Sequence, residues 1–288
     1  FIRANSTAGG FIYIEGARAD VLDSSFMFSS SNIIENGTGD GNGGAIYIAG
    51  DDAVVSGDFR FINATGGKGI PGHGGSIYVA GNNANITDST FFGTHARNYG
   101  FGGAIYVTGN NTYMNNDTFD NGFAYKAGAV YITGSDATIN MSNFVSNNCM
   151  DDGGALYITG EDVKVINSNF TRNTAGDDGG AIYWEGNDGL MENITCDDNK
   201  AISSTGSSNG GTICLTGNNT NVTKSTFSDN YAITVGGAIS IEASAVTLNE
   251  SNFYNNTATK GGALYVGGEG TDNYIYSSVF EGNKAIND

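Results

Sequence analysis

The stretch from Asp151 to Trp184 reads DDGGALYITGEDVKVINSNFTRNTAGDDGGAIYW and contains one motif twice. Two acids, two glycines, an alanine, a branched residue and a tyrosine return after 26 residues. A return at such an interval is typical of repeat proteins, in which each repeat contacts only its neighbours. The same motif recurs, with variations, along the whole chain.

The second glycine of the motif occurs in ten copies. It falls at Gly10, Gly44, Gly75, Gly103, Gly128, Gly154, Gly180, Gly211, Gly237 and Gly262. The shortest intervals between copies are 25 and 26 residues, and longer ones mark insertions. After each glycine pair, apolar residues alternate with tyrosine, as in Ile105, Tyr106 and Val107, which is the period of a β-strand. A second short strand ends in phenylalanine, and asparagine follows three residues later, as at Phe170 and Asn173.

About 25 residues make one three-sided coil of short strands and turns, and such coils stack ~4.8 Å apart. The repeat therefore predicts an all-β fold, a single-stranded, right-handed parallel β-helix of about ten coils, as one domain over residues 1–288. Asparagines in register would form an amide ladder inside the turn. A β-propeller blade would need ~40 residues. Because the pattern is already under way at both ends, we interpret the chain as a fragment of a longer rod.

Composition excludes several functions. The net charge of −18 argues against nucleic acid or an anionic membrane as partner, because both require a basic patch. No run of 18 apolar residues is present, so we expect no membrane insertion. Three cysteines are an odd number and do not make a disulfide framework. Cys196 stands at the inward phenylalanine register, which predicts that it is buried.

The pairing of GGAI, GGAL or GGAV with FxxN resembles the repeat of chlamydial polymorphic outer-membrane proteins. It is also similar to the adhesin-like proteins of methanogenic archaea. This chain departs from the repeat where Cys196 replaces the phenylalanine and where Cys214 and Ser240 replace the tyrosine. The resemblance implies an adhesive β-helical rod outside the cell, on its surface or wall, and leaves the ligand open.

We therefore expect an extracellular adhesin-like module that presents loops to glycans or to partner cells, and not an enzyme. Self-association along the rod is a further possibility. Two alternatives remain open. One is a carbohydrate-active β-helix enzyme, a polysaccharide lyase or a glycosidase, and the other is a purely structural rod of a wall or sheath. No Ser/His/Asp or Cys/His arrangement is visible in the sequence.

Three insertions, at 29–42, 62–73 and 92–101, precede the glycine pair in successive coils. Because they share a register, they should crowd one edge of the rod, and binding residues are often carried by such loops on a rigid scaffold. Ordinary tolerated insertions are the alternative interpretation. The predicted ligand contacts at this insertion edge are Lys68, His73, His95, Arg97 and Tyr99.

The tyrosine column is the second candidate surface. It consists of Tyr13, Tyr47, Tyr78, Tyr106, Tyr131, Tyr157, Tyr183 and Tyr265. Alternation with the apolar pair points these rings away from the core. They either stack on sugar rings or on a partner protein, or they stabilise the rod by packing on one another.

The acidic doublets Asp151–Asp152 and Asp177–Asp178 should stack in adjacent coils, ~4.8 Å apart. Like charges at that distance repel. Lys126, one coil before Asp152, would neutralise one carboxylate, and Ca²⁺ would suit the others. The alternatives are therefore a weak Ca²⁺ site or solvated turn acids, and no other cofactor is expected.

Sequons for N-glycosylation are frequent, and many fall on the same strand of the repeat. The candidates are Asn63, Asn85, Asn140, Asn169, Asn193, Asn221 and Asn249. Asparagine and threonine are common in this chain, so composition alone would produce some of them. Use of any of these sites would place the chain on an archaeal or eukaryotic surface.

Overall fold

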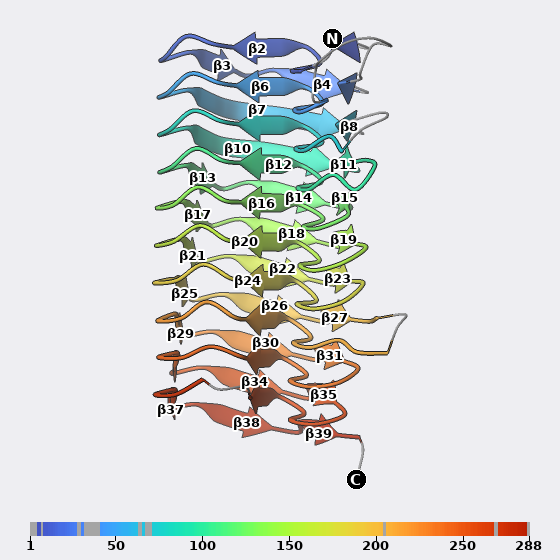
Figure 1. Ribbon diagram of the computed structural model, residues 1–288, viewed down its shortest axis with the longest axis vertical. Coiled ribbons are helices and arrows are strands. Elements are labelled where there is room, and N and C mark those ends of the chain that lie inside the picture. Colours follow the sequence, from blue (N-terminus) through green and yellow to red (C-terminus); the bar gives the residue numbers. More distant parts are fainter. Residues whose placement is uncertain are drawn as a thin grey trace.

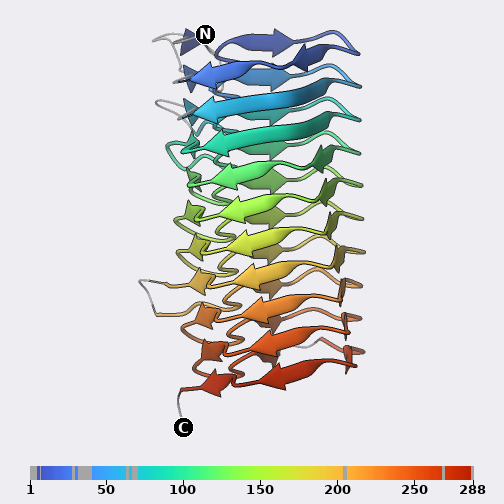
Figure 2. The same ribbon diagram turned by 180° about the vertical axis from the view of Figure 1, so that it is seen from behind.

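A computed structural model of the chain describes residues 5–6, 8–27, 30–31, 41–62, 65–66, 71–203, 206–267 and 270–286. Within these residues the regular elements are all β-strands, which stack coil upon coil along one axis (Figure 1). The N-terminus lies at one end of the rod and the C-terminus at the other, and the view from behind shows the same unbroken stack (Figure 2). The predicted parallel β-helix is confirmed.

Three sheets run the length of the rod, and each coil contributes to all three. The first sheet has one three-residue strand after each glycine pair. Its strands are β2 (Ile12–Ile14), β6 (Ile46–Ile48), β9 (Ile77–Val79), β12 (Ile105–Val107), β16 (Val130–Ile132), β20 (Leu156–Ile158), β24 (Ile182–Trp184), β28 (Ile213–Leu215), β32 (Ile239–Ile241) and β36 (Leu264–Val266).

The second sheet has two adjacent columns of short strands, which merge into one long strand in β7 and in β10. Its strands are β3 (Asp20–Leu22), β4 (Ser25–Met27), β7 (Val54–Ile62), β10 (Asn85–Phe92), β13 (Tyr113–Asn115), β14 (Thr118–Asp120), β17 (Thr138–Asn140), β18 (Asn143–Val145), β21 (Lys164–Ile166), β22 (Asn169–Thr171), β25 (Leu190–Glu192), β26 (Thr195–Asp197), β29 (Asn221–Thr223), β30 (Thr226–Ser228), β33 (Thr247–Asn249), β34 (Asn252–Tyr254), β37 (Tyr274–Tyr276) and β38 (Val279–Glu281).

The third sheet consists of two-residue strands and closes the coil. Its strands are β1 (Asn5–Ser6), β5 (Ser30–Ser31), β8 (Thr65–Gly66), β11 (His95–Ala96), β15 (Phe123–Ala124), β19 (Asn148–Cys149), β23 (Thr174–Ala175), β27 (Lys200–Ala201), β31 (Tyr231–Ala232), β35 (Thr257–Ala258) and β39 (Lys284–Ala285).

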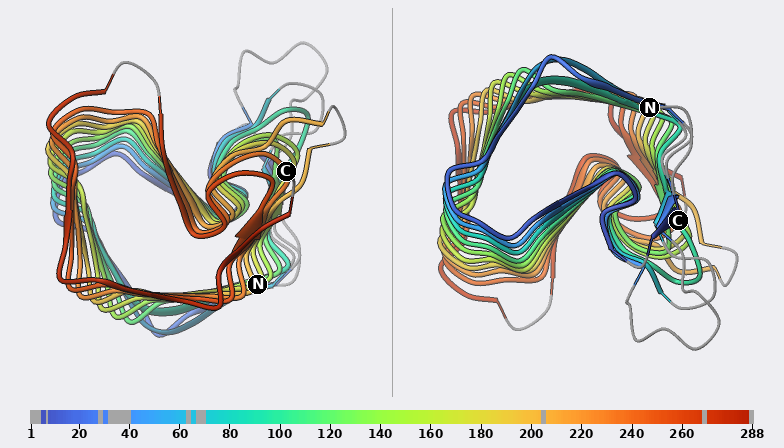
Figure 3. Two further views of the ribbon diagram at one scale, coloured as in Figure 1. Left: turned by 90° about the horizontal axis from the view of Figure 1, so that it is seen from below. Right: turned by 90° about the horizontal axis from the view of Figure 1, so that it is seen from above.

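Seen along the axis, the outline of each coil bends inward between the third and the first sheet (Figure 3). The glycine pair lies in this bend. Its first member has a positive φ, 71° at Gly153, which glycine adopts without strain. A Cβ on its second member, Gly154, would collide with the carbonyl oxygen of Gly180 and with the backbone of Thr174 in the third sheet. One glycine is therefore required for its conformation and the other for close backbone approach.

Two side-chain ladders fill the interior beside the branched residues of the first sheet. Phenylalanine rings stack from coil to coil, with centroids 4.7 Å apart between Phe144 and Phe170. Cys196 interrupts this column and is buried, as predicted. The second ladder consists of the asparagines three residues after the phenylalanine position. Each asparagine accepts hydrogen bonds from the coil before it, so that the Nδ2 of Asn147 donates to the Oδ1 of Asn173 at 3.0 Å. The ladder runs on to Asn283.

Replacement of Phe170 by alanine tests the interior ladder. Phe170 is fully buried, so Phe170→Ala should leave a cavity and lower the free energy of unfolding by about 3–5 kcal/mol. Chemical unfolding followed by circular dichroism measures this loss. A loss smaller than about 0.5 kcal/mol would contradict an interior phenylalanine column, because a buried ring cannot be removed at so small a cost.

Asp117 occupies a buried position that serine holds in other coils. Ser142 accepts a backbone N–H from the preceding coil and donates its own proton to the carbonyl oxygen of Asn140. The Oδ1 of Asp117 likewise accepts the N–H of Ser89 at 2.9 Å, but its buried Oδ2 has no partner. Burial raises the pKa of Asp117 well above its usual range, although the hydrogen bond from Ser89 acts in the opposite direction.

Asp117→Ser should therefore stabilise the protein, by about 1–3 kcal/mol at pH 8, because it removes an unsatisfied buried group. A carboxyl whose pKa is raised on folding loses stability as the pH rises above its unfolded value of about 4. The gain over the unsubstituted protein should thus be larger at pH 8 than at pH 5. Urea unfolding at both pH values measures it, and an equal gain at both would contradict a raised pKa.

Candidate functional site

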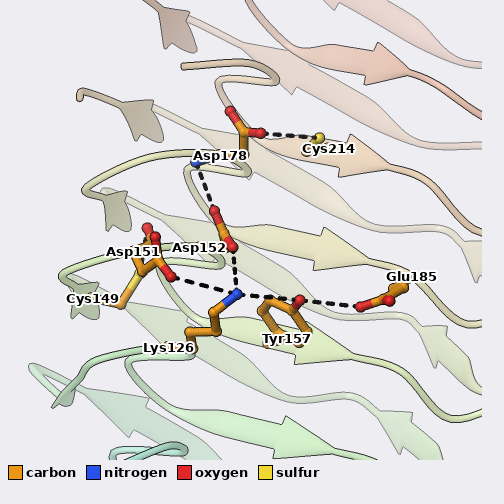
Figure 4. A network of polar contacts seen from close by, with 8 residues as sticks. All are labelled: Lys126, Cys149, Asp151, Asp152, Tyr157, Asp178, Glu185 and Cys214. Carbon is orange, nitrogen blue, oxygen red and sulfur yellow. Dashed lines mark hydrogen bonds and ion pairs between the residues drawn. The ribbon is translucent and has the colours of Figure 1, made fainter. Parts of the chain in front are cut away.

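The acidic doublets meet Lys126 in the loop that precedes the glycine pair (Figure 4). The Nζ of Lys126 lies 2.7 Å from an oxygen of Asp152 and 3.5 Å from an oxygen of Asp151. It also lies 4.5 Å from the centre of the Tyr157 ring. The predicted pairing of Lys126 with Asp152 is confirmed, and the tyrosine ring beneath the ammonium group adds a cation–π contact.

The network continues into the next coils. An oxygen of Asp152 accepts the backbone N–H of Asp178 at 3.2 Å, and Asp178 accepts the N–H of Asn209 at 2.7 Å. The thiol of Cys214 lies 3.9 Å from the other oxygen of Asp178. On the opposite side, the hydroxyl of Tyr157 donates to Glu185 at 3.1 Å. The contacts of Glu185 and Cys214 did not follow from the repeat pattern.

Burial and charge shift the ionisation of these groups in opposite directions. Burial by itself would lower the pKa of Lys126, but the hydrogen bond to Asp152 and its charge raise it above the usual range. Burial raises the pKa of Asp178 to about 7, and the charges of Asp177 and Asp152 add to the shift. The pKa of Asp178 therefore lies near neutral pH, whereas Lys126 stays charged.

The structure brings three of the four predicted metal ligands together. Oxygens of Asp151, Asp152 and Asp177 lie within 4.8 Å of one another, and Asp178 does not belong to this group. Carboxylate oxygens suit Ca²⁺. The ammonium group of Lys126 already contacts two of these three carboxylates, so a cation would have to displace it.

The tyrosine column points away from the core, but its rings are not the free stripe that alternation suggested. Neighbouring rings are stacked, with centroids 4.8 Å apart and planes 4° apart for Tyr131 and Tyr157. These two rings are only 8% and 6% exposed. Residues that precede the glycine pair cover the column, such as Phe101 on Tyr131 and Lys126 on Tyr157. Of the two interpretations of this column, the stabilising stack describes its centre.

The predicted insertion edge divides into two parts. His73 turns onto the tyrosine column, where its ring stacks on Tyr106 with centroids 4.8 Å apart and its Nδ1 accepts the N–H of Phe101. His95 lies on the third sheet, followed by the exposed residues Arg97 and Tyr99. His73 therefore packs on the tyrosine column and does not lie with His95, Arg97 and Tyr99. Lys68 lies outside the described residues.

Two aromatic residues were missed beside the insertion edge. Phe123 follows His95 in the third sheet as its direct partner in the next coil. Tyr125 contacts the ring of Tyr99, with centroids 5.2 Å apart. Both stand at the register of His95 and Arg97 one coil later, so comparison of the coils position by position was the signal that could have found them.

The sequons differ in accessibility. Asn169 and Asn221 are exposed on the second sheet, and Asn193 is exposed in the bend between β25 and β26. The Nδ2 groups of Asn169 and Asn193 donate to Asn143 and Asn167. Asn140 is 8% exposed and its Nδ2 donates to Asn115, so the fold leaves no room there for a glycan, and its candidacy is withdrawn. Asn85 and Asn249 are half-buried, and the buried Oδ1 of each has no hydrogen-bond partner. Asn63 lies outside the described residues.

Residues 103–280 match the family described as the right handed beta helix region. Because this match covers more than half of the chain, the protein belongs to that family, and the predicted hand of the coil is confirmed. No curated protein matches the chain. Within the part of the chain that the structure describes, there is no helix of a length and hydropathy suited to crossing a membrane. The description of the family names a fold and no ligand, so the function of the site follows from its chemistry alone.

Asp178→Asn should change how stability depends on pH. A carboxyl whose pKa is raised to about 7 on folding destabilises the protein progressively as the pH rises from about 4 to 7. The amide keeps an acceptor for the N–H of Asn209 and does not titrate. The variant should therefore unfold at a higher urea concentration than the unsubstituted protein at pH 8, with a smaller difference at pH 5.

Asp229→Asn is the matched control for this measurement. Asp229 is an exposed turn residue with a φ of 56°, which asparagine also tolerates. Its replacement should leave the pH dependence nearly unchanged. If Asp178→Asn behaves like this control, the raised pKa of Asp178 is wrong.

Lys126→Gln tests the Ca²⁺ hypothesis. Removal of the ammonium group frees two carboxylates, so Ca²⁺ should bind the variant more tightly than the unsubstituted protein, and Asp151→Asn in addition should weaken binding again. Isothermal titration calorimetry with millimolar Ca²⁺ measures both effects. Absence of any heat in Lys126→Gln would leave the interpretation as solvated turn acids.

Proposed function

We propose that the chain is an extracellular, adhesin-like segment of a cell-surface protein, and that its rod presents loops to glycans or to partner cells. The observation that carries the proposal is the turn at 97–100, which lies in the longer, 28-residue interval between Gly75 and Gly103. Arg97, Asn98 and Tyr99 are all exposed there. In a rigid solenoid with a variable loop, the stacked coils fix the position of the loop, and the loop residues contact the ligand.

Several features of the rod agree with this role outside the cell. The surface has a net charge of −18, which favours solubility and opposes non-specific contact with anionic surfaces. Three exposed sequons, at Asn169, Asn193 and Asn221, lie on the strands of the second sheet or in the bend between two of them. The repeat also resembles those of adhesin-like proteins. These features support a location outside the cell, whereas the turn at 97–100 supports the recognition of glycans or partner cells.

A three-residue deletion tests the proposal. Removal of Asn98, Tyr99 and Gly100 shortens the interval between Gly75 and Gly103 from 28 to 25 residues, the length of the next coil. The unsubstituted protein should bind on a glycan array or to whole cells, and the deletion should reduce binding. Because the deleted residues lie outside the stacked strands, the melting temperature should stay nearly unchanged. A rod that binds no glycan and no cell would contradict the proposal.

One observation favours a carbohydrate-active enzyme as second candidate. Asp178, with a pKa of about 7, lies next to Asp152, and acid catalysis on sugars uses a carboxyl that is protonated near neutral pH. Incubation with acidic and neutral polysaccharides, followed by reducing-end analysis, tests this candidate. Cleavage that Asp178→Asn abolishes would support an enzyme.

A further inference from the structure

A sugar ring binds to protein aromatics by packing its C–H face on a free ring face, and the two aromatic surfaces of this rod differ in that respect. From Tyr47 to Tyr157 each ring of the tyrosine column lies between two neighbours, with planes 3° apart for Tyr47 and Tyr78, so the faces of these rings are occupied. Only ring edges are left for a ligand. The third sheet and its following turn carry rings whose faces are not paired in this way.

His95 and Phe123 are partners in the third sheet, and their ring planes are inclined by 51° with centroids 5.9 Å apart. Phe123 is 37% exposed, and Phe92, at the end of β10 just before the corner that leads to His95, is 45% exposed. The rings of Tyr99 and Tyr125 meet edge to face, with planes 66° apart. In both ring pairs an inclined contact leaves part of a ring face open to solvent.

The backbone at Tyr99 is unfavourable for a tyrosine. Asn98 and Tyr99 have φ values of 53° and 64°, and the N–H of Gly100 donates to the carbonyl oxygen of Arg97 at 3.0 Å, which closes the turn. Asparagine tolerates this conformation, but a bulky residue does so only with strain. Tyr99 is 68% exposed, so burial in the core does not offset that strain. Positive φ values recur in the turns of other coils, mostly at asparagine and aspartate, and among the described residues Tyr99 is the one aromatic residue with such a φ.

Charge narrows the class of ligand. Arg97 is exposed two residues after His95 on a protein of net charge −18, and its positive charge acts on the His95 ring. Arginine binds carboxylates through two parallel hydrogen bonds. Burial, together with the charge of Arg97, lowers the pKa of His95, so its imidazole is neutral at pH 7 and suited to a sugar hydroxyl. A carboxylate on the ligand would be attracted to Arg97, whereas Asp151, one coil beyond Tyr125, carries the opposite charge.

We propose that this surface binds a carboxylated saccharide by stacking of its sugar rings and by pairing of its carboxylate with Arg97. The aromatic patch consists of Phe92, His95, Arg97, Tyr99, Phe123 and Tyr125. This inference rests on the proposed recognition of glycans and names both the ligand class and the residues. Phe92, Phe123 and Tyr125 enter it from the structure alone.

Isothermal titration calorimetry with hexagalacturonate as acidic probe and maltohexaose as neutral probe tests the proposal. The unsubstituted protein should bind hexagalacturonate more tightly. Tyr99→Gly and Phe123→Ser should each weaken that binding about tenfold, the loss expected for one stacking contact. Arg97→Gln should remove the preference for the acidic probe.

Two comparisons separate binding from folding. Tyr113→Ser removes an exposed tyrosine from the second sheet in the coil of Phe123 and should leave binding unchanged. Tyr99→Gly should raise the denaturation midpoint, because glycine relieves the backbone strain, while it lowers affinity. A variant that simply failed to fold would lose affinity together with a lowered denaturation midpoint.

The outcomes distinguish this inference from the function on which it rests. If the protein binds glycans on the array but Tyr99→Gly and Phe123→Ser bind hexagalacturonate normally, the aromatic patch is not the site and the proposed function stands. Equal binding of both probes overturns the carboxylate as the recognised group. If no glycan binds at all, the proposed function and this inference fail together.

Discussion

The close approach of two backbones, at the second glycine of each pair, is the constraint on which this rod depends. At Gly154 a single added carbon would meet both the next coil and the third sheet. The approach lets the chain bend inward between the third and the first sheet, and this bend brings the preceding loop over the outer face of the first sheet (Figure 3). The tyrosine column is covered for that reason. A less tightly closed coil would leave its rings in water.

The same bend explains why charged groups are partly buried on the outside of a solenoid. The loop partly buries Asp152 and Asp178, and a carboxylate is poorly solvated where water is scarce. One lysine at this place, Lys126, compensates for part of the negative charge. Burial, together with the charges of Asp177 and Asp152, raises the pKa of Asp178 to about 7. The raised pKa values of Asp152 and Asp178 are thus a consequence of the loop's position.

Repetition also separates stability from recognition. The side chains of the phenylalanine and asparagine ladders contact one another from coil to coil. Few of their atoms are therefore free to contact a partner. Recognition requires groups that differ from coil to coil. The turn at Asn98 and Tyr99 meets that requirement, because it interrupts the repeat and places a strained, exposed ring beside Arg97.

The fold could be predicted from the sequence because the same residue pattern recurs in each coil. The glycine pair, the alternation around tyrosine and the FxxN spacing together determine three sheets, an interior phenylalanine column and an asparagine ladder. The contact of Lys126 with Asp152 followed from register alone, since residues one coil apart lie side by side. Repeat length, alternation and register are local or periodic properties, and a sequence displays them directly.

Tertiary structure alone decided which outward residues are accessible. Alternation indicates that a side chain leaves the core, but not whether another part of the coil covers it, and so Tyr131 and Tyr157 are buried although they point outward. The same reason applies to His73, which a shared insertion register placed with His95 but which the inward bend turns onto Tyr106. The strain at Tyr99 is likewise a backbone property that no residue pattern displays. Exposure and strain depend on how the coil closes on itself, and that closure is a three-dimensional property.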